Sequence, residues 1–202
     1  MMGTTSAIRT LAAALLPLAL SVFGAQAAPV FMPGADRTTQ PIGHYELCQR
    51  MPEECAEKTA RRQPVELTRD LWAQMVDINN AVNTMITPRT DMEMWGREEV
   101  WSYPDREGDC EDYVLEKRRQ LMQLGVAPGQ LLITVVRQRN GDGHAVLTMR
   151  TSLGDFVLDN LEPKILAWTE TDYQFLKRQS ERNSGVWVSV NDSRNTLVGS
   201  VK

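Results

Sequence analysis

The tripeptide Asp109-Cys110-Glu111, together with His144 and Asp159, contains the side chains from which a covalent catalytic site can be built. A thiolate attacks a carbonyl carbon, an imidazole removes and returns the proton, and a carboxylate orients the imidazole. The three groups occur in the order Cys, His, Asp and predict cysteine-dependent acyl transfer. Because chain order alone proves nothing, the elements that position these residues must support the hypothesis.

Cys110 is predicted to lie in the first turn of a helix that runs from about residue 110 to 124. Asp109 is a suitable N-cap, and Gly125 is a natural C-terminal stop. A helix N-terminus presents unpaired N–H groups and the positive end of the dipole. Both lower the pKa of a thiol, and the N–H groups can stabilise an oxyanion.

His144 and Asp159 are predicted to meet at one edge of a small antiparallel sheet. We expect strands at residues 131 to 137, 144 to 151 and 155 to 161, joined by turns that contain Gly, Asn and Asp. The start of one strand lies beside the end of its antiparallel neighbour, so a hydrogen bond from His144 to Asp159 is reasonable. Residues 186 to 190 are a further strand candidate, preceded by a loop and a short helix that cover the sheet.

The first half of the chain is expected to be helical and irregular. Residues 28 to 45 contain several Pro and Gly residues and predict an irregular arm. Apolar residues at helical spacing predict a helix from Leu67 to Ile86. Residues 90 to 104 are less regular, and Trp95 or Trp101 in this segment is a candidate second oxyanion donor.

Residues 1 to 27 resemble a secretory signal peptide. Arg9 precedes an apolar run, and Ala25-Gln26-Ala27 provides the small residues of a cleavage site. We therefore expect cleavage after Ala27, a periplasmic or secreted product, and one domain over residues 28–202. The alternative is an uncleaved anchor.

The charge of the chain excludes some classes of partner. Its formal net charge is −4 at pH 7, and loss of Arg9 with the leader makes it more negative. An acidic protein without a basic stripe is a poor candidate for binding nucleic acid or an anionic membrane surface.

The three cysteines are an odd number, so in an oxidising compartment we expect one disulfide and one free thiol. Cys48 and Cys55 are close in sequence and form the predicted disulfide, which leaves Cys110 free. A buried structural thiol is the alternative for Cys110, but its polar neighbours argue against it. His44 lies beside the disulfide without an evident carboxylate partner and is disfavoured as a second catalytic imidazole.

The acidic neighbours of Cys110 need an explanation of their own. Asp109 and Glu111 raise the pKa of a nearby thiol. Salt bridges offset this effect, and so does a hard cation such as Ca²⁺, which prefers carboxylate ligands. Asp109 and Glu111 are therefore candidate metal ligands, with helix-capping carboxylates as the alternative.

Three motifs together resemble the bacterial transglutaminase-like cysteine proteinases. They are Gly-Asp-Cys-Glu-Asp-Tyr at 108 to 113, Gly-His-Ala-Val at 143 to 146 and Leu-Asp-Asn at 158 to 160. The resemblance covers roughly residues 42 to 190. It implies an α+β fold with a papain-like, transglutaminase-like core, in which N-terminal helices pack on a small antiparallel β-sheet.

The resemblance also implies roles for the residues that match these motifs. Cys110 is the expected nucleophile, His144 the general base and then acid, and Asp159 the residue that orients it. Members of one branch are calcium-dependent periplasmic proteases, which implies that Asp109 and Glu111 take part in binding Ca²⁺. That branch cuts large surface adhesins and is sequestered by an inner-membrane receptor for cyclic di-GMP, in control of biofilms.

Three functions remain open at this point. The first is an exported cysteine endopeptidase that acts through a Cys-His-Asp triad on a surface or periplasmic protein. The second is a transglutaminase-type acyltransferase or amidase with the same triad, because both reactions pass through a thioester. The third is a non-catalytic binding module that retains the fold. No organic cofactor is expected.

Overall fold

The computed structural model describes residues 28–56, 58–60 and 63–194, so the predicted leader at residues 1–27 lies outside the described residues. Seven strands form an antiparallel sheet in the order β1-β9-β8-β4-β5-β6-β7. Their bounds are β1 Gly34–Thr38, β4 Leu131–Arg137, β5 Gly143–Thr151, β6 Gly154–Leu158, β7 Leu166–Ala167, β8 Gln174–Ser180 and β9 Asn183–Val190. A separate short parallel pair joins β2 Thr87–Pro88 to β3 Glu107–Gly108.

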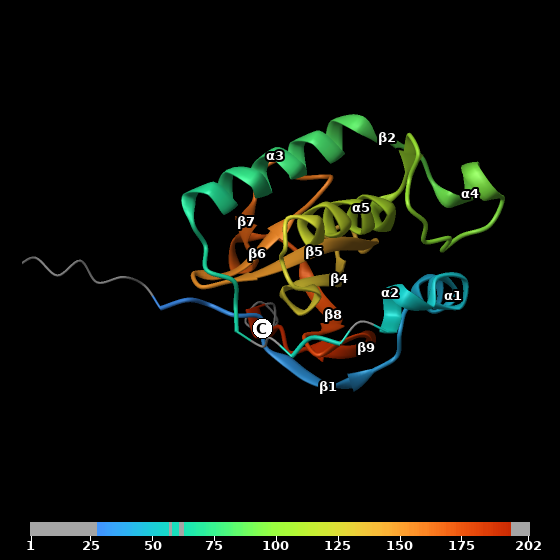
Figure 1. Ribbon diagram of the computed structural model, residues 1–202. Coiled ribbons are helices and arrows are strands. Elements are labelled where there is room, and N and C mark those ends of the chain that lie inside the picture. Colours follow the sequence, from blue (N-terminus) through green and yellow to red (C-terminus); the bar gives the residue numbers. More distant parts are fainter. Residues whose placement is uncertain (1–27, 57, 61–62, 195–202) are drawn as a thin grey trace, which may run out of the picture.

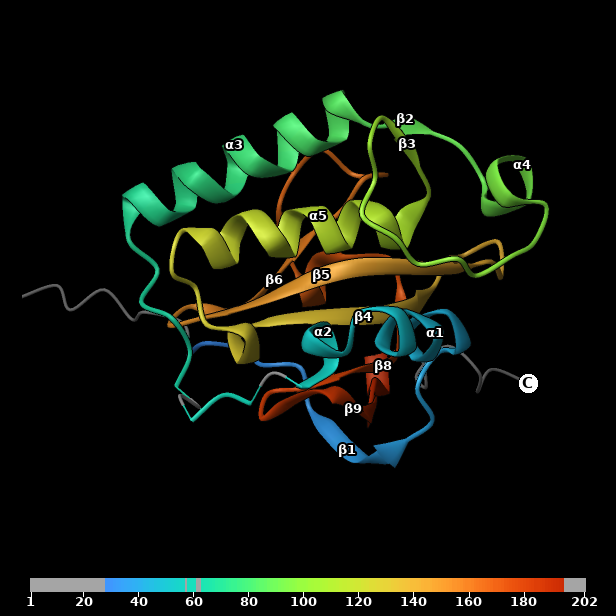
Figure 2. The ribbon, with the colours of Figure 1, turned by 45° about the vertical axis from the view of Figure 1, so that its right-hand side comes forward.

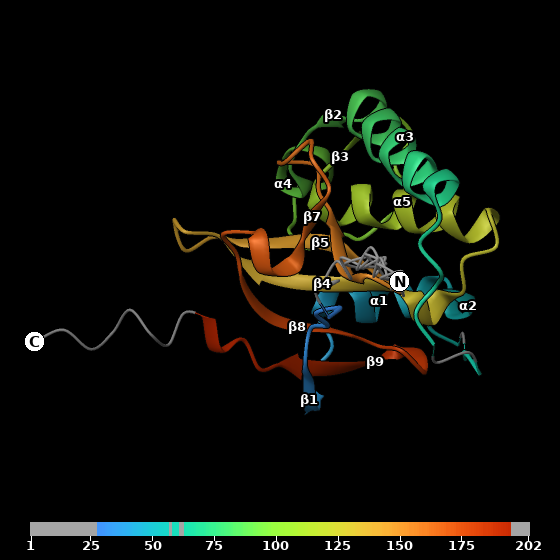
Figure 3. The same cartoon turned by 90° about the vertical axis from the view of Figure 1, so that its left-hand side faces the viewer.

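The helices lie mainly before the large sheet in sequence, and α5 and α2 pack against it. Their bounds are α1 Ile42–Arg50, α2 Pro52–Ala56, α3 Arg69–Met85, α4 Asp91–Trp95 and α5 Cys110–Gln123, with short 3₁₀ turns at Pro128–Gln130 and Trp168–Glu170. In Figures 1 and 2, α5 lies over β5 and α3 covers α5 from outside. Figure 3 shows the same order of layers from the side. The predicted α+β fold, with helices packed on an antiparallel sheet, is confirmed.

Helix α5 fits its predicted position, and its ends follow from local chemistry. Gly125 has a φ of +89°, which favours glycine, and its N–H donates to the Met122 carbonyl oxygen at 2.9 Å. Asp109 is the N-cap residue, as predicted, but its side chain makes no capping hydrogen bond. Instead, its carboxylate accepts a hydrogen bond from the Asp91 N–H at 3.3 Å.

Strands β4 and β5 are buried on both faces, as their nearly continuous apolar sequences require. On one face, Leu131, Ile133 and Leu147 pack with Val114 and Leu121 of α5. On the other face, a second cluster covers the strands; it contains Met32, Val136, Val146, Val157, Trp168, Phe175 and Val190. The central strands are thus held rigidly, and His144 lies at the start of one of them, paired with Val136.

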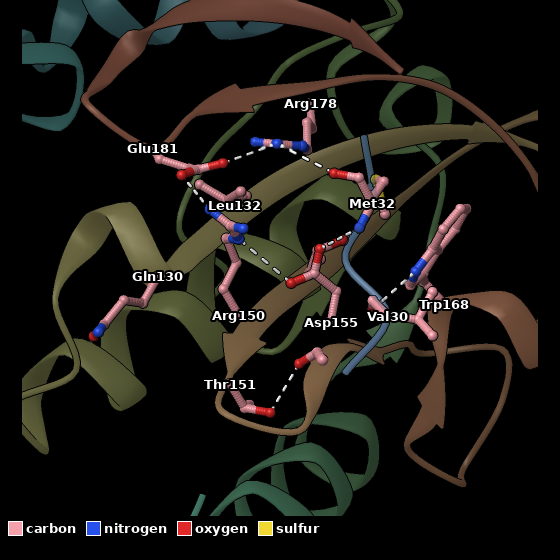
Figure 4. A network of polar contacts seen from close by, with 12 residues as sticks. Val30, Met32, Gln130, Leu132, Arg150, Thr151, Asp155, Trp168, Arg178 and Glu181 are labelled. Atoms are coloured by element: carbon pink, nitrogen blue, oxygen red, sulfur yellow. Dashed lines mark hydrogen bonds and ion pairs between the residues drawn. The ribbon is translucent and has the colours of Figure 1, made fainter. Parts of the chain in front are cut away.

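The prediction of an irregular arm over residues 28 to 45 is wrong. Strand β1 pairs with β9, and α1 begins at Ile42. Figure 4 shows how the preceding segment is anchored: the Met32 N–H donates to buried Asp155 at 2.8 Å, and the Trp168 indole donates to the Val30 carbonyl at 3.2 Å. Long-range pairing therefore orders a segment whose own composition favours irregular structure.

The loop expected ahead of the last strand contains β8, which lies between β4 and β9. Its polar sequence, Gln-Phe-Leu-Lys-Arg-Gln-Ser, shows no strand pattern. Buried Arg178 pairs with Glu181 at 3.0 Å, and buried Gln179 accepts from the Ile133 N–H at 3.1 Å. Since partners from other elements satisfy these groups, β8 remains in the sheet.

The structure confirms the predicted disulfide between Cys48 and Cys55, whose Cα atoms are 5.5 Å apart. It joins α1 to α2.

The helix predicted from Leu67 to Ile86 is α3, and Thr68 caps it by accepting from the Leu71 N–H at 3.1 Å. Among the described residues, no helix is both long enough and apolar enough to cross a membrane.

Candidate active site

His144 and Asp159 form the hydrogen bond expected from the sequence. His144 Nε2 lies 2.8 Å from Asp159 Oδ1, and both side chains are buried. Burial alone would raise the pKa of Asp159, but the hydrogen bond and charge of His144, with further donors, hold it below its usual value. Because the ionised carboxylate can only accept, Nε2 carries the hydrogen and Nδ1 is left as the basic atom.

Tyr173 is a site residue that the sequence reasoning missed. Its hydroxyl donates to Asp159 Oδ2 at 2.5 Å, and its ring centroid lies 5.6 Å from that of His144. The Leu161 N–H donates to Asp159 Oδ1 at 3.0 Å. Donors therefore hold both oxygens of the carboxylate and fix its orientation toward His144. Tyr173 precedes the missed strand β8, so no local pattern pointed to it.

Cys110 is the first residue of α5, the helix that packs on β5. Its partly buried thiol lies within hydrogen-bonding reach of the Ala145 N–H, next in the chain to His144. The structure thus brings together the three residues that the sequence singled out: a thiol at a helix N-terminus, an imidazole at a strand start and a carboxylate at the end of the next strand.

The thiol is not activated in the way the helix position alone predicts. Burial raises the pKa of Cys110 well above its usual value, and the Glu111 charge and hydrogen bond raise it further. The thiol donates to Glu111 Oε2 at 3.1 Å. The hydrogen bond from the Ala145 N–H lowers the pKa of the thiol, but by less than the other effects raise it. The expected depression of the thiol pKa therefore requires a compensating positive charge.

A cluster of three carboxylates lies beside the thiol. Oxygens of Asp91, Asp109 and Glu111 lie within 4.8 Å of one another. One oxygen of Asp91 and one of Asp109 are buried without a hydrogen-bond partner. Burial, followed by the charge of Asp109, raises the pKa of Glu111 to about 9. Unpartnered oxygens and mutually repelling carboxylates are the donor set that a hard cation satisfies.

Asp91 joins the predicted pair Asp109 and Glu111, and sequence reasoning missed it. The segment was expected to be irregular, but Thr90 and Glu93 form a capping box that starts α4 with Asp91 as its first residue. The spacing of Thr and Glu was a readable signal for this helix. Nothing in that spacing indicated that α4 lies beside Cys110.

Other residues considered from the sequence have structural roles. His44 is buried between Trp101 and Trp187, and burial, with a contribution from Arg118, lowers its pKa to about 4. The Trp101 indole donates to Glu99 at 3.2 Å and is not available to an oxyanion. Trp95 is exposed on α4. Neither tryptophan is placed as the second oxyanion donor.

A cavity of about 250 Å³ adjoins the Asp159 side of the site. Asp159 and Tyr173 form part of its wall. The remaining lining mixes apolar and charged side chains: Val157, Leu161, Leu166, Arg139, Glu162, Lys164, Glu170 and Asp172, with Gln138 and Thr171. The cavity thus offers both apolar and polar groups beside Asp159, whereas Cys110 and His144 do not line it.

Solved structures of LapG from Legionella pneumophila share this fold. The calcium-bound form matches with a TM-score of 0.51 and 26% sequence identity, over 62% of this chain and 74% of that chain. The EGTA-treated form matches with a TM-score of 0.50 and 23% identity, over 80% of this chain and 87% of that chain.

Sequence comparisons identify the family. Comparison with curated proteins gives no significant match. The family description of the bacterial transglutaminase-like cysteine proteinases (BTLCP) matches residues 34–195, which is most of the chain. This match includes all the residues assembled at the site. The chain therefore belongs to the bacterial transglutaminase-like cysteine proteinases and is a cysteine peptidase.

Proposed function

We propose that this protein is an exported, calcium-dependent endopeptidase in which Cys110 is the nucleophile, His144 the general base and Asp159 the orienting carboxylate. The observation that carries the proposal is the hydrogen bond between His144 and Asp159. It lies next to Ala145, the residue of β5 whose N–H is within hydrogen-bonding reach of the Cys110 thiol. This arrangement supplies the groups for acyl transfer in one place.

The reaction follows from the orientation of these groups. His144 Nδ1 takes the thiol proton, and the thiolate attacks the peptide carbonyl carbon. Backbone N–H groups at the start of α5 stabilise the oxyanion. The imidazolium then gives its proton to the leaving amine, which departs as the thioester forms. Water, deprotonated by His144, hydrolyses the thioester and regenerates the thiol.

Asp91, Asp109 and Glu111 are the proposed calcium ligands. The unpartnered, buried oxygens of Asp91 and Asp109, close to the carboxylate of Glu111, fit a divalent cation, which would supply the positive charge that this cluster lacks. The similarity to calcium-bound LapG supports this assignment. A further carboxylate, Asp112, lies nearby; it accepts a hydrogen bond from the Ser102 N–H at 2.8 Å and retains one unpartnered oxygen.

The calcium proposal predicts that the ion stabilises the fold. A ligand that binds the folded state at 100 times its Kd stabilises by roughly 2.7 kcal/mol. Adding EGTA should therefore lower the melting temperature of the wild-type protein, and Asp91→Asn should abolish this calcium effect. Asp105→Asn, at an exposed position near the site, is the matched control. An identical melting temperature with calcium and with EGTA would contradict the proposed metal site.

The decisive test of the reaction combines alkylation with product analysis. Iodoacetamide labelling with peptide mapping should modify Cys110 rapidly in the wild type, more slowly after His144→Ala, and not after Cys110→Ser. Cleavage of a protein substrate should fall at least a thousandfold in Cys110→Ser, which leaves only background catalysis. Wild-type cleavage rates in a folded Cys110→Ser protein would disprove the assignment of the nucleophile.

Hydrolysis and transamidation share the thioester, so a labelled primary amine separates them. An endopeptidase gives new N-termini, whereas an acyltransferase incorporates the amine into a side-chain amide. The family favours the endopeptidase. The resemblance of this chain to the calcium-dependent periplasmic branch of the family extends the proposal. It adds a large surface adhesin as the substrate, an inner-membrane cyclic di-GMP receptor as the regulator, and the periplasm as the location.

A further inference from the structure

Helix α5 carries a second buried functional group, Lys117, whose ammonium has no assigned role. The side chain is 0% exposed, and its Nζ has no hydrogen-bond partner. It lies 5.9 Å from the centroid of the Tyr113 ring. Seven residues, or about two helical turns, separate it from Cys110, so the two share one face of α5. An unpartnered ammonium in the interior is costly and calls for an explanation.

Three buried amide oxygens in the same part of the fold also lack partners. They belong to Asn79 and Asn83 of α3 and to Asn160, which follows Asp159. The amide nitrogens of the first two are occupied: Asn83 donates to the Asp159 carbonyl at 2.8 Å, and Asn79 donates to the Pro163 carbonyl at 3.3 Å. Asn160 is therefore part of the segment at residues 159–163, and Asn79 and Asn83 are hydrogen-bonded to it.

The unmatched groups are complementary. A lysine ammonium has three donors and no acceptor, whereas each amide oxygen is an acceptor. Helices α3 and α5 pack together, and the charge of Asp159 acts on Lys117. Buried waters commonly make about three hydrogen bonds to groups that the protein leaves unsatisfied. Ordered water between these atoms would satisfy donors and acceptors together.

We propose that Lys117 is a positioning residue of the triad: its buried ammonium, linked by water to Asn79, Asn83 and Asn160, holds the segment that carries Asp159 and supplies a positive charge behind its carboxylate. This inference rests on the proposed Cys-His-Asp function. A nearby cation favours the ionised carboxylate, which is the form that accepts from His144. Lys117 thereby acts on the thiol only through Asp159 and His144.

Other titratable and charged groups lie around Asp159 and also influence its ionisation. His144 faces it from β5, and Tyr173 faces it from the segment before β8. The charged residues that line the adjoining cavity are Arg139, Glu162, Lys164, Glu170 and Asp172. Lys117 differs from the cavity residues because it is buried on α5. Burial lowers its pKa to about 7, and Asp159 acts to raise it, so the ammonium is charged in mildly acidic solution.

The test measures the rate of Cys110 alkylation by iodoacetamide at pH 6.5 with saturating calcium, in variants matched by charge. Lys117→Met should slow alkylation about tenfold, the effect of one pKa unit on a reactive form. Lys117→Arg, which keeps the charge, should restore most of the rate. The Lys117→Met, Asp159→Asn double variant should be no slower than Asp159→Asn alone. Rapid wild-type alkylation that Asp159→Asn slows establishes the proposed triad independently of Lys117.

Two structural readouts complete the test. The sequence contains only His44 and His144, so His44 is an internal reference for imidazole NMR signals. Lys117→Met should shift the His144 ring signals and leave those of His44 in place, and a crystal structure should show water on Lys117 Nζ. Alkylation within twofold of wild type in folded Lys117→Met, or losses that add fully in the double variant, would overturn the proposal. If Lys117→Met fails to fold, Lys117→Gln takes its place under the same criteria.

Discussion

At the residue scale, the site depends on how each oxygen of Asp159 is used. One oxygen accepts from His144 at 2.8 Å, and the other accepts from Tyr173 at 2.5 Å. With both oxygens held, the carboxylate cannot rotate away from the imidazole without breaking a hydrogen bond. The orientation of His144 therefore depends on Tyr173, which takes no direct part in the proposed attack by the thiol.

Tyr173→Phe tests this dependence. Loss of one hydrogen bond to a charged group costs about 1.5 kcal/mol, so peptide cleavage should slow by roughly tenfold. The matched control is Tyr45→Phe, because Tyr45 is 51% exposed. Initial rates of product formation at fixed calcium compare the two variants. Equal rates for Tyr173→Phe and wild type would show that Asp159 is held sufficiently by its other donors.

Lys117 gives a second residue-scale prediction, concerning stability and pH. Burial lowers its pKa to about 7, against about 10.4 in an unfolded chain. Between these values the unfolded state binds more protons, so this group makes the folded state more stable as the pH rises. The cost of burying the ammonium is greatest below pH 7. The stability of Lys117→Met relative to wild type should therefore be highest at pH 6 and lowest near pH 10.

Urea denaturation of both proteins at pH 6 and pH 9.5 measures this difference. Lys164, on the wall of the cavity, provides the exposed control: Lys164→Met should show no comparable dependence on pH. A stability gain for Lys117→Met that is the same at both pH values would contradict the burial of a titrating ammonium.

At the element scale, the start of α5 combines two opposing influences on one thiol. The helix end favours negative charge, whereas the carboxylates of Asp109 and Glu111 oppose it. Helix α4 adds Asp91 to the same cluster. The two helices thus concentrate negative charge beside the thiol of Cys110, where the proposed calcium ion would add positive charge. Helices α1 and α2, joined by the disulfide, take no part in this cluster.

The disulfide should therefore affect stability without affecting the chemistry. A bridge that closes a sequence separation of 7 residues stabilises by about 2 kcal/mol in the chain-entropy description. Replacing both Cys48 and Cys55 by Ser should lower the free energy of unfolding by about this amount. The rate of Cys110 alkylation should be unchanged while the protein is folded. A well-folded double variant with slow alkylation would place α1 and α2 in the active site after all.

The difference between local and long-range signals explains what the sequence could predict. Cys110, His144 and Asp159 lie next to local patterns: a helix start, a strand start and a strand end. Tyr173 and Asp91 lie in segments whose local patterns were weak or misread, and only tertiary packing brings them to the site. Strands β1 and β8 were missed for the same reason, since pairing with β9 and burial of charged groups order them. Helix α5 followed from the residues at its two ends, whereas the α+β fold with a papain-like, transglutaminase-like core was implied by the family resemblance.

At the scale of the whole molecule, a buried charge network joins the N-terminal segment to the sheet. Asp155 accepts from the Met32 N–H at 2.8 Å and from Arg150 at 3.4 Å, while Arg150 also pairs with Glu181 (Figure 4). Arg178 pairs with Glu181 at 3.0 Å. Two cations and two anions balance one another here. Removing the charge of Asp155 leaves Arg150 and Arg178 to share the single carboxylate of Glu181.

Asp155→Asn should consequently destabilise the whole fold. Breaking a buried ion pair costs about 3 kcal/mol or more, which for a chain of this size is roughly 6–12 °C in melting temperature. Asp36→Asn, at an exposed position on β1, is the control and should change the melting temperature little. Differential scanning calorimetry measures both. A shift for Asp155→Asn no larger than that of the control would mean that the network does not anchor the segment.

The pairing of β1 with β9 also has a consequence for the order of folding. Gly34 lies opposite Val190, whereas β4, β5 and β6 are consecutive in sequence and pair with their immediate neighbours. Closing a long loop costs more entropy than closing a short one, so the meander that carries His144 should form before the sheet edge closes. Strand β1, the first of the described strands to be synthesised, would then remain unpaired for the longest time, until β9 is available.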